Sequence, residues 1–316
     1  MALSPGDTGE EVRQLQRRLG EAGFLPDRGV VKATYCSATA EAVSSFQTDR
    51  GLPSTGVCDD DTWHTLLEAS WNLGDRALVL RSPNLRGDDV AEIQRVLSRL
   101  GFDCGRIDGI FGPLADRALR DFQQNAGLEV DGTCGGSLVD HLRVLSRQTG
   151  DGPGIAAIRD LEDLKHGQPL ASMKVAIGRF GDVEDLAEPL MAALDDHGAV
   201  VIPTEEPTAA AQAAHANLFE AEVFVGLEHV DDTRHRVAYY AVPAFESAGG
   251  RSLAHLVERH LRDVIPGVDV VGLRLPILRE TKMPAVLVTI GSADDVVDRS
   301  ARIAEALYLA LVAWSR

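Results

Sequence analysis

Four side chains that can bind a cation lie close together in the second half of the chain. They are Glu228, His229, Asp231 and His235. Carboxylate oxygens and imidazole nitrogens are common protein ligands of zinc. Glu228 and His229 end an apolar run, however, and successive side chains of a strand point to opposite faces. The spacing favours surface or hydrogen-bonded histidines and leaves a substitute metal site open.

The sequence lacks the motifs of several other kinds of chemistry. It contains no Gly-x-Ser-x-Gly phrase and no partnered cysteine–histidine motif. Ala248-Gly249-Gly250 is an isolated turn rather than a phosphate-binding loop. The cysteines lie in the first half without Cys-x-x-Cys spacing, so we expect reduced thiols. They are Cys36, Cys58, Cys104 and Cys134.

The first half contains two copies of one unit. The phrase at residues 11–19 recurs at residues 89–97, and Phe46-Gln47 recurs as Phe122-Gln123. Apolar residues three and four apart predict the first helix of each copy. These residues are Val12, Leu15 and Leu19 in one copy, and Val90, Ile93 and Leu97 in the other. Phe46 and Phe122 mark a second helix, and Leu66 and Leu142 a third.

The second half alternates between apolar runs and helical stretches. Strands are predicted at residues 174–177, 200–202, 223–227, 237–240, 268–271 and 286–290. Helices are predicted near residues 183–197, 207–220, 246–264 and 293–314. This alternation is typical of an α/β domain with a mostly parallel sheet.

The predicted fold is therefore multidomain, with two small three-helix all-α repeats followed by an α/β domain. We expect the repeats at residues 4–72 and 82–147, a linker at 148–170, and the α/β domain at 171–316.

The formal net charge is −17, which disfavours nucleic acid and anionic lipid as partners. The N-terminal residues lack the pattern of a secretory signal, and no run of about 18 apolar residues predicts a membrane span. A cytoplasmic location is the expectation.

Several phrases carry a resemblance to a known family. Asp108-Gly109-Ile110-Phe111-Gly112, with Ala118 and Phe122-Gln123, resembles the pattern of peptidoglycan-binding domain type 1. In that family the turn borders a groove for the stem peptide. The resemblance implies that Asp108, Gly109, Phe111 and Gly112 bind ligand. The alternative is structural, with both glycines forming a tight turn, Phe111 in the core and Asp108 capping the turn.

The second half resembles the zinc amidases that cut the bond between N-acetylmuramic acid and L-alanine. Residues 278–288, which begin Leu-Arg-Glu-Thr-Lys-Met-Pro, are the most specific part of this resemblance. Residues 174–181 and 213–227 carry the rest.

The residues of the family's zinc site differ in this chain. By position, the first histidine ligand falls on Arg179, the later histidine on Glu228, and the catalytic glutamate on Thr289. The remaining ligand, a glutamate, has no matching position. Arginine is a permanent cation that repels zinc. We expect no metal and no cofactor, with Arg179 paired to Glu228 across the former zinc cleft.

The resemblance thus implies a non-catalytic pseudo-amidase similar to actinobacterial amidase-like regulators. Expected partners are peptidoglycan or its precursors, a peptidoglycan-synthesis enzyme, or the lipid II flippase. The alternative is an active zinc N-acetylmuramoyl-L-alanine amidase of cell-wall turnover, which requires zinc. A wall-binding module without a regulatory role is a third possibility.

Overall fold

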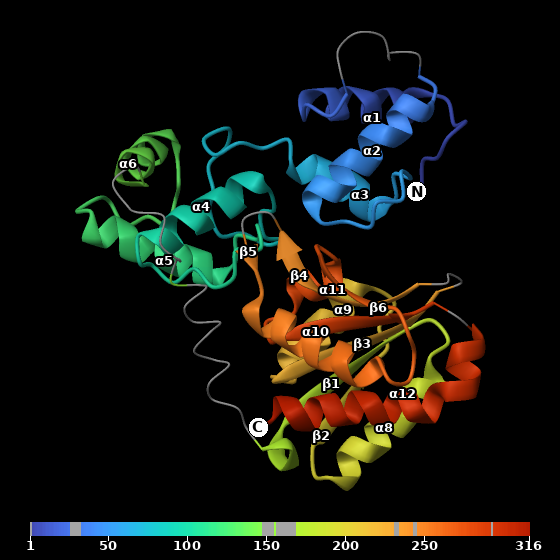
Figure 1. The fold of residues 1–316 in the computed structure, drawn as a ribbon. Coiled ribbons are helices and arrows are strands. Elements are labelled where there is room, and N and C mark those ends of the chain that lie inside the picture. Colours follow the sequence, from blue (N-terminus) through green and yellow to red (C-terminus); the bar gives the residue numbers. More distant parts are fainter. Residues whose placement is uncertain are drawn as a thin grey trace. The chain divides into compact units, whose positions relative to one another are not determined.

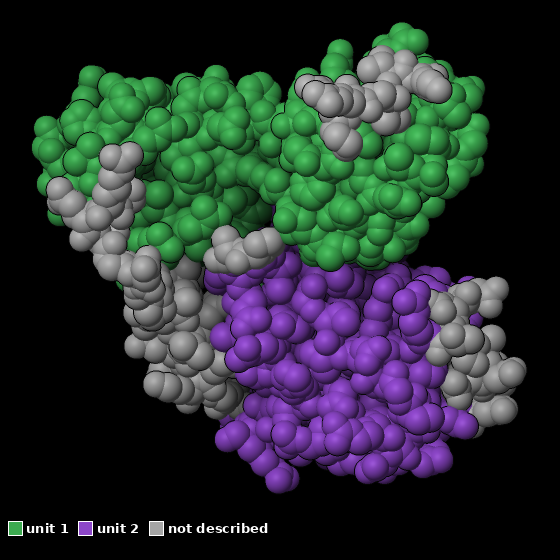
Figure 2. Space-filling model, turned by 45° about the horizontal axis from the view of Figure 1, so that its top comes forward, with its two compact units in different colours: residues 1–159 green, residues 160–316 purple. Residues whose placement is uncertain are grey.

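The computed structural model describes residues 2–25, 33–146, 155, 169–230, 234–242, 245–291 and 293–316. It contains two compact units, residues 1–159 and residues 160–316, which Figure 2 colours separately. The predicted linker lies almost wholly outside the described residues. The predicted domain boundaries therefore stay predictions.

The first unit is helical, as predicted. The helices of the first repeat are α1 (Glu10–Glu21), α2 (Ser37–Arg50) and α3 (Asp60–Glu68). Those of the second are α4 (Asp88–Arg99), α5 (Pro113–Asn125) and α6 (Gly136–Ser146) (Figure 1). Each repeat has a hydrophobic core of its own.

Local sequence explains where these helices lie. In α4 the predicted stripe of Val90, Ile93 and Leu97 is fully buried. Acidic residues occupy its first turn, where they complement the helix dipole. Gly101 follows the helix with a φ of 90°, a conformation that favours glycine. The first helix of the other repeat ends in the same way and is followed by Gly23 at a φ of 83°.

Two ion pairs tie the second repeat to the residues before it. Arg50 at the end of α2 contacts Asp88 at the start of α4. Arg76, from the connection between the repeats, binds Asp89 through two hydrogen bonds of 2.7 and 3.0 Å. Asp89 is only 1% exposed, so removing Arg76 would leave a buried carboxylate without its ion-pair partner.

The second unit is built on a seven-stranded sheet. Its strands are β1 (Lys174–Phe180), β2 (Val200–Thr204), β3 (Val223–His229), β4 (His235–Val242), β5 (Phe245–Glu246), β6 (Val268–Leu273) and β7 (Ala285–Ile290). The order is β2-β1-β3-β7-β4-β5, and β6 also pairs with β4. The sheet is mostly parallel, as predicted, but β4 runs antiparallel to β7 and β5.

Helices cover both faces of the sheet. On one face lie α8 (Glu184–Asp196), α10 (Ala248–Leu261) and α12 (Ala293–Trp314), with α8 beside α12 (Figure 1). On the other face lie α9 (Ala209–Leu218) and the short α11 (Pro276–Glu280). A single turn of 3-10 helix, η1 (Leu170–Ser172), precedes β1. The predicted strands and helices of this unit are confirmed, whereas β5, α11 and η1 were not predicted.

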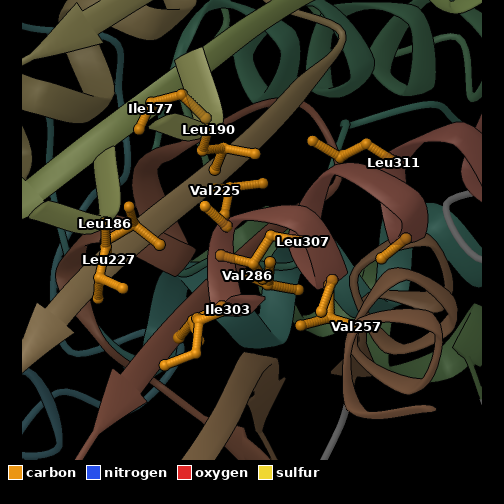
Figure 3. Close-up of a cluster of buried hydrophobic side chains, with 14 of the residues drawn as sticks. Ile177, Leu186, Leu190, Val225, Leu227, Val257, Val286, Ile303, Leu307 and Leu311 are labelled. Carbon is orange, nitrogen blue, oxygen red and sulfur yellow. The ribbon is translucent and has the colours of Figure 1, made fainter. Parts of the chain in front are cut away.

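The main core lies between the sheet and α8, α10 and α12. Ile177, Val225 and Val286 of the strands meet Leu190 of α8 and Leu307 of α12 in this layer (Figure 3). Burying one such aliphatic side chain stabilises the fold by about 1.5–3 kcal/mol. None of the helices among the described residues combines the length and apolarity needed for a membrane span.

Candidate functional site

A row of side chains crosses the sheet near the carboxyl end of β1. Phe180 pairs in register with Glu228 of β3, and Glu228 pairs with Thr289 of β7. Arg236 of β4 pairs with Thr289 in turn. Residues that pair in register lie side by side on the same face of a sheet. Two of the three positions carried over from the resemblance, Glu228 and Thr289, therefore meet.

Hydrogen bonds connect the polar members of this row. The Thr289 hydroxyl donates to Glu228 Oε2 at 2.7 Å, and Arg236 Nε donates to Thr289 Oγ1 at 3.3 Å. Arg236 Nη2 lies 3.8 Å from the same Glu228 oxygen. The three side chains form a closed polar cluster, the Glu228–Thr289–Arg236 cluster. Arg236 was missed from the sequence because nothing local shows that β4 pairs with β7.

Phe180 fills the space beside this cluster. A Cβ atom added at Gly178 or at Gly226 would come within 3.2 Å of Phe180 Cε2. The ring therefore lies against both glycines, on the face that carries Glu228. Larger residues at either glycine would displace it.

Arg179 is turned away from Glu228. Its Nη2 donates to Glu188 Oε1 of α8 at 2.5 Å, and its Nη1 lies 2.9 Å from Glu205 Oε1. The predicted ion pair between Arg179 and Glu228 is wrong. The reason is strand alternation, since Arg179 pairs in register with Leu227 of the buried core and so faces the helices on that side.

A cavity of about 470 Å³ opens at the carboxyl ends of β1 and β3. It is lined by Phe180, Glu228 and His229 and by the residues that enter α9, including Glu206 and Gln212. The strand order reverses here, because β1 continues to β2 on one side and lies beside β3 on the other. Such a reversal is where open α/β sheets form a ligand crevice.

Two residues that line this cavity, Glu206 and His229, each have a side-chain atom that solvent does not reach. Glu206 Oε1 contacts His215 Nδ1 of α9, while Glu206 Oε2 is buried. The imidazole Nε2 of His229 is buried as well. Neither buried atom has a hydrogen-bond partner within the described part of the chain. Glu206 belongs to none of the sequence motifs described above, so only the fold identifies it.

The four cation-binding candidates from the sequence do not share one environment. His235 is buried at the start of β4, where its Nδ1 accepts a hydrogen bond from Gly291 N at 3.2 Å. Glu228 and His229 line the cavity. Asp231 lies outside the described residues.

In the second repeat, the candidate ligand loop is held by a glutamine. Gln94 of α4 donates to Asp108 Oδ1 at 2.8 Å and to Ile110 O at 3.2 Å. Its Oε1 accepts from the amides of Asp108 and Gly109, at 3.2 and 2.8 Å. Asp108 Oδ1 also accepts from Ile110 N at 2.8 Å, which closes a side-chain turn.

The remaining loop residues also have clear structural roles. Gly109 has a φ of 70°, so the turn needs a residue without a side chain there. Phe111 is completely buried in the repeat's core, and Gly112 precedes α5. The structural interpretation of these residues matches this geometry. Their contact with a ligand stays a prediction.

A second glutamine of this repeat holds an Asp-Gly turn in the same way. Gln123 of α5 donates to Asp131 Oδ1 at 2.7 Å and accepts from Gly132 N at 2.9 Å. In the first repeat, Gln47 likewise accepts from Gly56 N at 2.9 Å. These glutamines could have been recognised in the sequence, because each one follows an apolar core residue in the repeated phrases.

Known proteins resemble both parts of the chain. The family model of the putative peptidoglycan binding domain matches residues 8–66 and 86–142, which are the two helical repeats. The spore cortex-lytic enzyme of Oceanobacillus iheyensis is 48% identical over 56 residues, or 18% of this chain and 20% of that enzyme.

One relative covers both units of the chain. The N-acetylmuramoyl-L-alanine amidase CwlM of Mycobacterium tuberculosis is 32% identical over 94% of this chain and 84% of its own length. A probable N-acetylmuramoyl-L-alanine amidase of Bacillus licheniformis is 32% identical over 42% of each chain. One solved structure, the CwlD amidase from Clostridioides difficile in complex with the GerS lipoprotein, matches 45% of this chain and 98% of its own, with 12% identity and a TM-score of 0.34. The resemblance predicted from the sequence is confirmed, and the chain belongs to the family of N-acetylmuramoyl-L-alanine amidase-like proteins that includes CwlM.

Proposed function

We propose that this chain is a non-catalytic amidase homologue that binds a peptidoglycan precursor or a biosynthetic partner and regulates peptidoglycan synthesis. The observation that supports it most is the Glu228–Thr289–Arg236 cluster. Its hydroxyl and guanidinium groups occupy the neighbourhood in which the amidase resemblance implies a metal ligand and a catalytic base.

The donor set does not fit a zinc ion. Zinc hydrolysis needs three protein ligands with free lone pairs and a carboxylate that takes a proton from the attacking water. Arg179 is a permanent cation held by Glu188 and Glu205. Thr289 has no basic oxygen, and the Arg236 charge close to Glu228 disfavours a second cation. We therefore derive no hydrolytic step for this chain.

The two repeats support the binding part of the proposal. Both match the peptidoglycan-binding family, and the second has a loop held in one conformation by Gln94. The proposed ligand-binding positions remain Asp108, Gly109, Phe111 and Gly112, with Phe111 acting from the core beneath the loop. The proposed partners are a peptidoglycan-synthesis enzyme or the lipid II flippase. The proposed location is the cytoplasm, which cell fractionation tests.

The second candidate function is an active zinc amidase. The observation that favours it is the 32% identity to relatives named as amidases. Under this alternative the chain cleaves the amide between muramic acid and L-alanine and retains zinc. A catalytic role therefore predicts free stem peptide among the reaction products.

The experiment that separates the two candidates is a muropeptide hydrolysis assay. The full chain is incubated with muropeptides and added zinc, and the products are analysed by liquid chromatography and mass spectrometry. The Bacillus licheniformis relative, which is named a probable amidase, serves as the positive control. We expect no release of stem peptide by this chain under conditions in which the control acts. Release by this chain above the protein-free blank would overturn the non-catalytic proposal.

A further inference from the structure

The two helical repeats have separate hydrophobic cores. The core of the first repeat includes Phe46 and Leu66, whereas that of the second includes Leu73 from the connection between them. No described residue belongs to both cores. Within the part of the chain that the structure describes, no helix of one repeat packs broadly against a helix of the other. Apolar burial therefore does not fix the arrangement of the two repeats.

The connection between the repeats is built into the second one. Leu73 and Leu78 both lie in its core. Leu78 exchanges backbone hydrogen bonds with Cys134 at 3.0 and 2.8 Å, and Arg143 Nη2 of α6 donates to the carbonyl of Leu73 at 3.1 Å. The connection from Leu73 onward is therefore a part of the second repeat.

The junction between the repeats lies at residues 70–72. The amide of Trp71 donates to the carbonyl of Glu68 at the end of α3, at 3.4 Å, which is long for a hydrogen bond. The Trp71 ring lies on the other side of the junction, with its centroid 4.5 Å from Arg76 Cζ. Arg76 in turn binds the buried carboxylate of Asp89. This short stretch is where one repeat can turn against the other.

An ion pair joins the repeats across this junction. Arg50, the last residue of α2, contacts Asp88, the first residue of α4. Each charge also complements the dipole of its own helix end. Arg50 is oriented by Asp49 at 3.2 Å and by the Phe46 ring, whose centroid lies 5.6 Å from its Cζ. The guanidinium is thus positioned for its partner in the second repeat.

Exposure determines which ion pair near the junction can open. The side chains of Arg50 and Asp88 are 24% and 31% exposed, whereas that of Asp89 is 1% exposed. Water and salt reach the first pair but not the Asp89 carboxylate. A partly exposed pair is weak by itself. The junction compensates for this weakness, because it keeps the two partners at a high effective concentration.

We propose that the Arg50–Asp88 ion pair is a salt-sensitive latch that closes the two repeats into one body, with residues 70–72 as the hinge. When the latch is open, the first repeat turns independently of the second. Closed repeats meet a repetitive ligand at one fixed spacing, which lowers the entropy cost of binding through both. The inference goes beyond the proposed function, because the latch operates whatever the repeats bind.

The test measures the distance between one spin label in each repeat of the full chain. The natural Cys36 is exposed and takes the first label, and Gln124→Cys provides the second at an exposed position of α5. The other three cysteines are buried. Double electron–electron resonance then gives the distribution of label distances. We expect one narrow peak at about 0.01 M salt and a distribution at least about twice as wide at about 1 M, where the Debye length falls to about 3 Å.

Variants in the labelled chain assign the effect to the ion pair. Arg50→Glu should widen the distribution at low salt, and adding Asp88→Arg should restore the narrow peak. Arg13→Glu makes the same charge change at an exposed ion pair within α1, and it should keep the narrow peak. Thermal unfolding of each variant checks that it folds.

Three results would overturn the latch. The first is a distribution of equal width at low and high salt in the chain without these charge changes. The second is a narrow peak that persists in Arg50→Glu. The third is a folded double variant whose distribution is as wide as that of Arg50→Glu, because the restored pair should close the repeats again.

Discussion

At the scale of single residues, the partners of a side chain decide what chemistry it can perform. Glu228 accepts a hydrogen bond from Thr289 and lies against the Arg236 guanidinium, so its lone pairs are already used in part. Glu206 has the same carboxylate, yet one of its oxygens is buried and receives no hydrogen bond from any described residue. The two glutamates line one cavity, and their carboxylates have different partners.

The cysteines give a prediction at this scale. Burial raises the pKa of the Cys58 and Cys134 thiols to about 12, whereas hydrogen bonds from Thr39 lower the pKa of the exposed Cys36 thiol. The thiolate is the reactive form. We expect the native chain to react rapidly with a disulfide reagent at pH 8 through one thiol, Cys36. All four thiols should react once the chain is unfolded in denaturant.

The matched variant for this measurement is Cys36→Ser. It should remove the fast phase and leave the total in denaturant lower by one thiol. A fast phase that persists in this variant would show that a buried cysteine is accessible, against the burial described above.

At the scale of elements, a glutamine on a helix holds a glycine turn in each repeat. Gln94 and Gln123 each connect their helix to an Asp-Gly turn through both ends of the amide. The amide is well suited to this task because it both donates and accepts. These contacts fix the loops that connect the helices, which matters in repeats whose cores are small.

Replacing Gln94 tests whether these glutamine contacts stabilise the repeat. Gln94 is 1% exposed, and Gln94→Ala removes the acceptor of the buried Gly109 amide together with its donation to Asp108 and Ile110. We expect a loss of about 2–3 kcal/mol in the free energy of unfolding of the second repeat. Gln124→Ala, at an exposed position of α5, should change it by less than about 0.5 kcal/mol. Hydrogen exchange of the α4 amides in increasing urea measures both values, and equal effects of the two variants would contradict the account.

Most elements could be predicted from the sequence because their signal is local. The stripe of Val90, Ile93 and Leu97 and the apolar run at residues 223–227 each mark an element without knowledge of its neighbours. Strand partners are not local. The antiparallel pairing of β4 with β7 brings Arg236 to Thr289, and no feature of the strand itself indicates it. The predicted Arg179–Glu228 ion pair was wrong for the same reason. The register between β1 and β3 places Arg179 beside Leu227 rather than beside Glu228.

At the scale of the whole molecule, two units of different fold share one chain. The repeats match a peptidoglycan-binding family, and the α/β unit belongs with amidase-like proteins. A net charge of −17 disfavours nucleic acid and anionic lipid as ligands of either unit. Under our proposal, the repeats and the α/β unit both bind, and neither cleaves.

The most direct test of this account is the zinc content of the untagged protein. The full chain is equilibrated with one equivalent of zinc, desalted and analysed for metal, beside a Glu228→Ala variant. The account predicts retention near zero in both, because Arg236 places fixed positive charge beside Glu228, and Arg179 and Thr289 cannot act as zinc ligands. Stoichiometric zinc in the natural chain that is lost in Glu228→Ala would contradict it and identify a metal site at the end of β3.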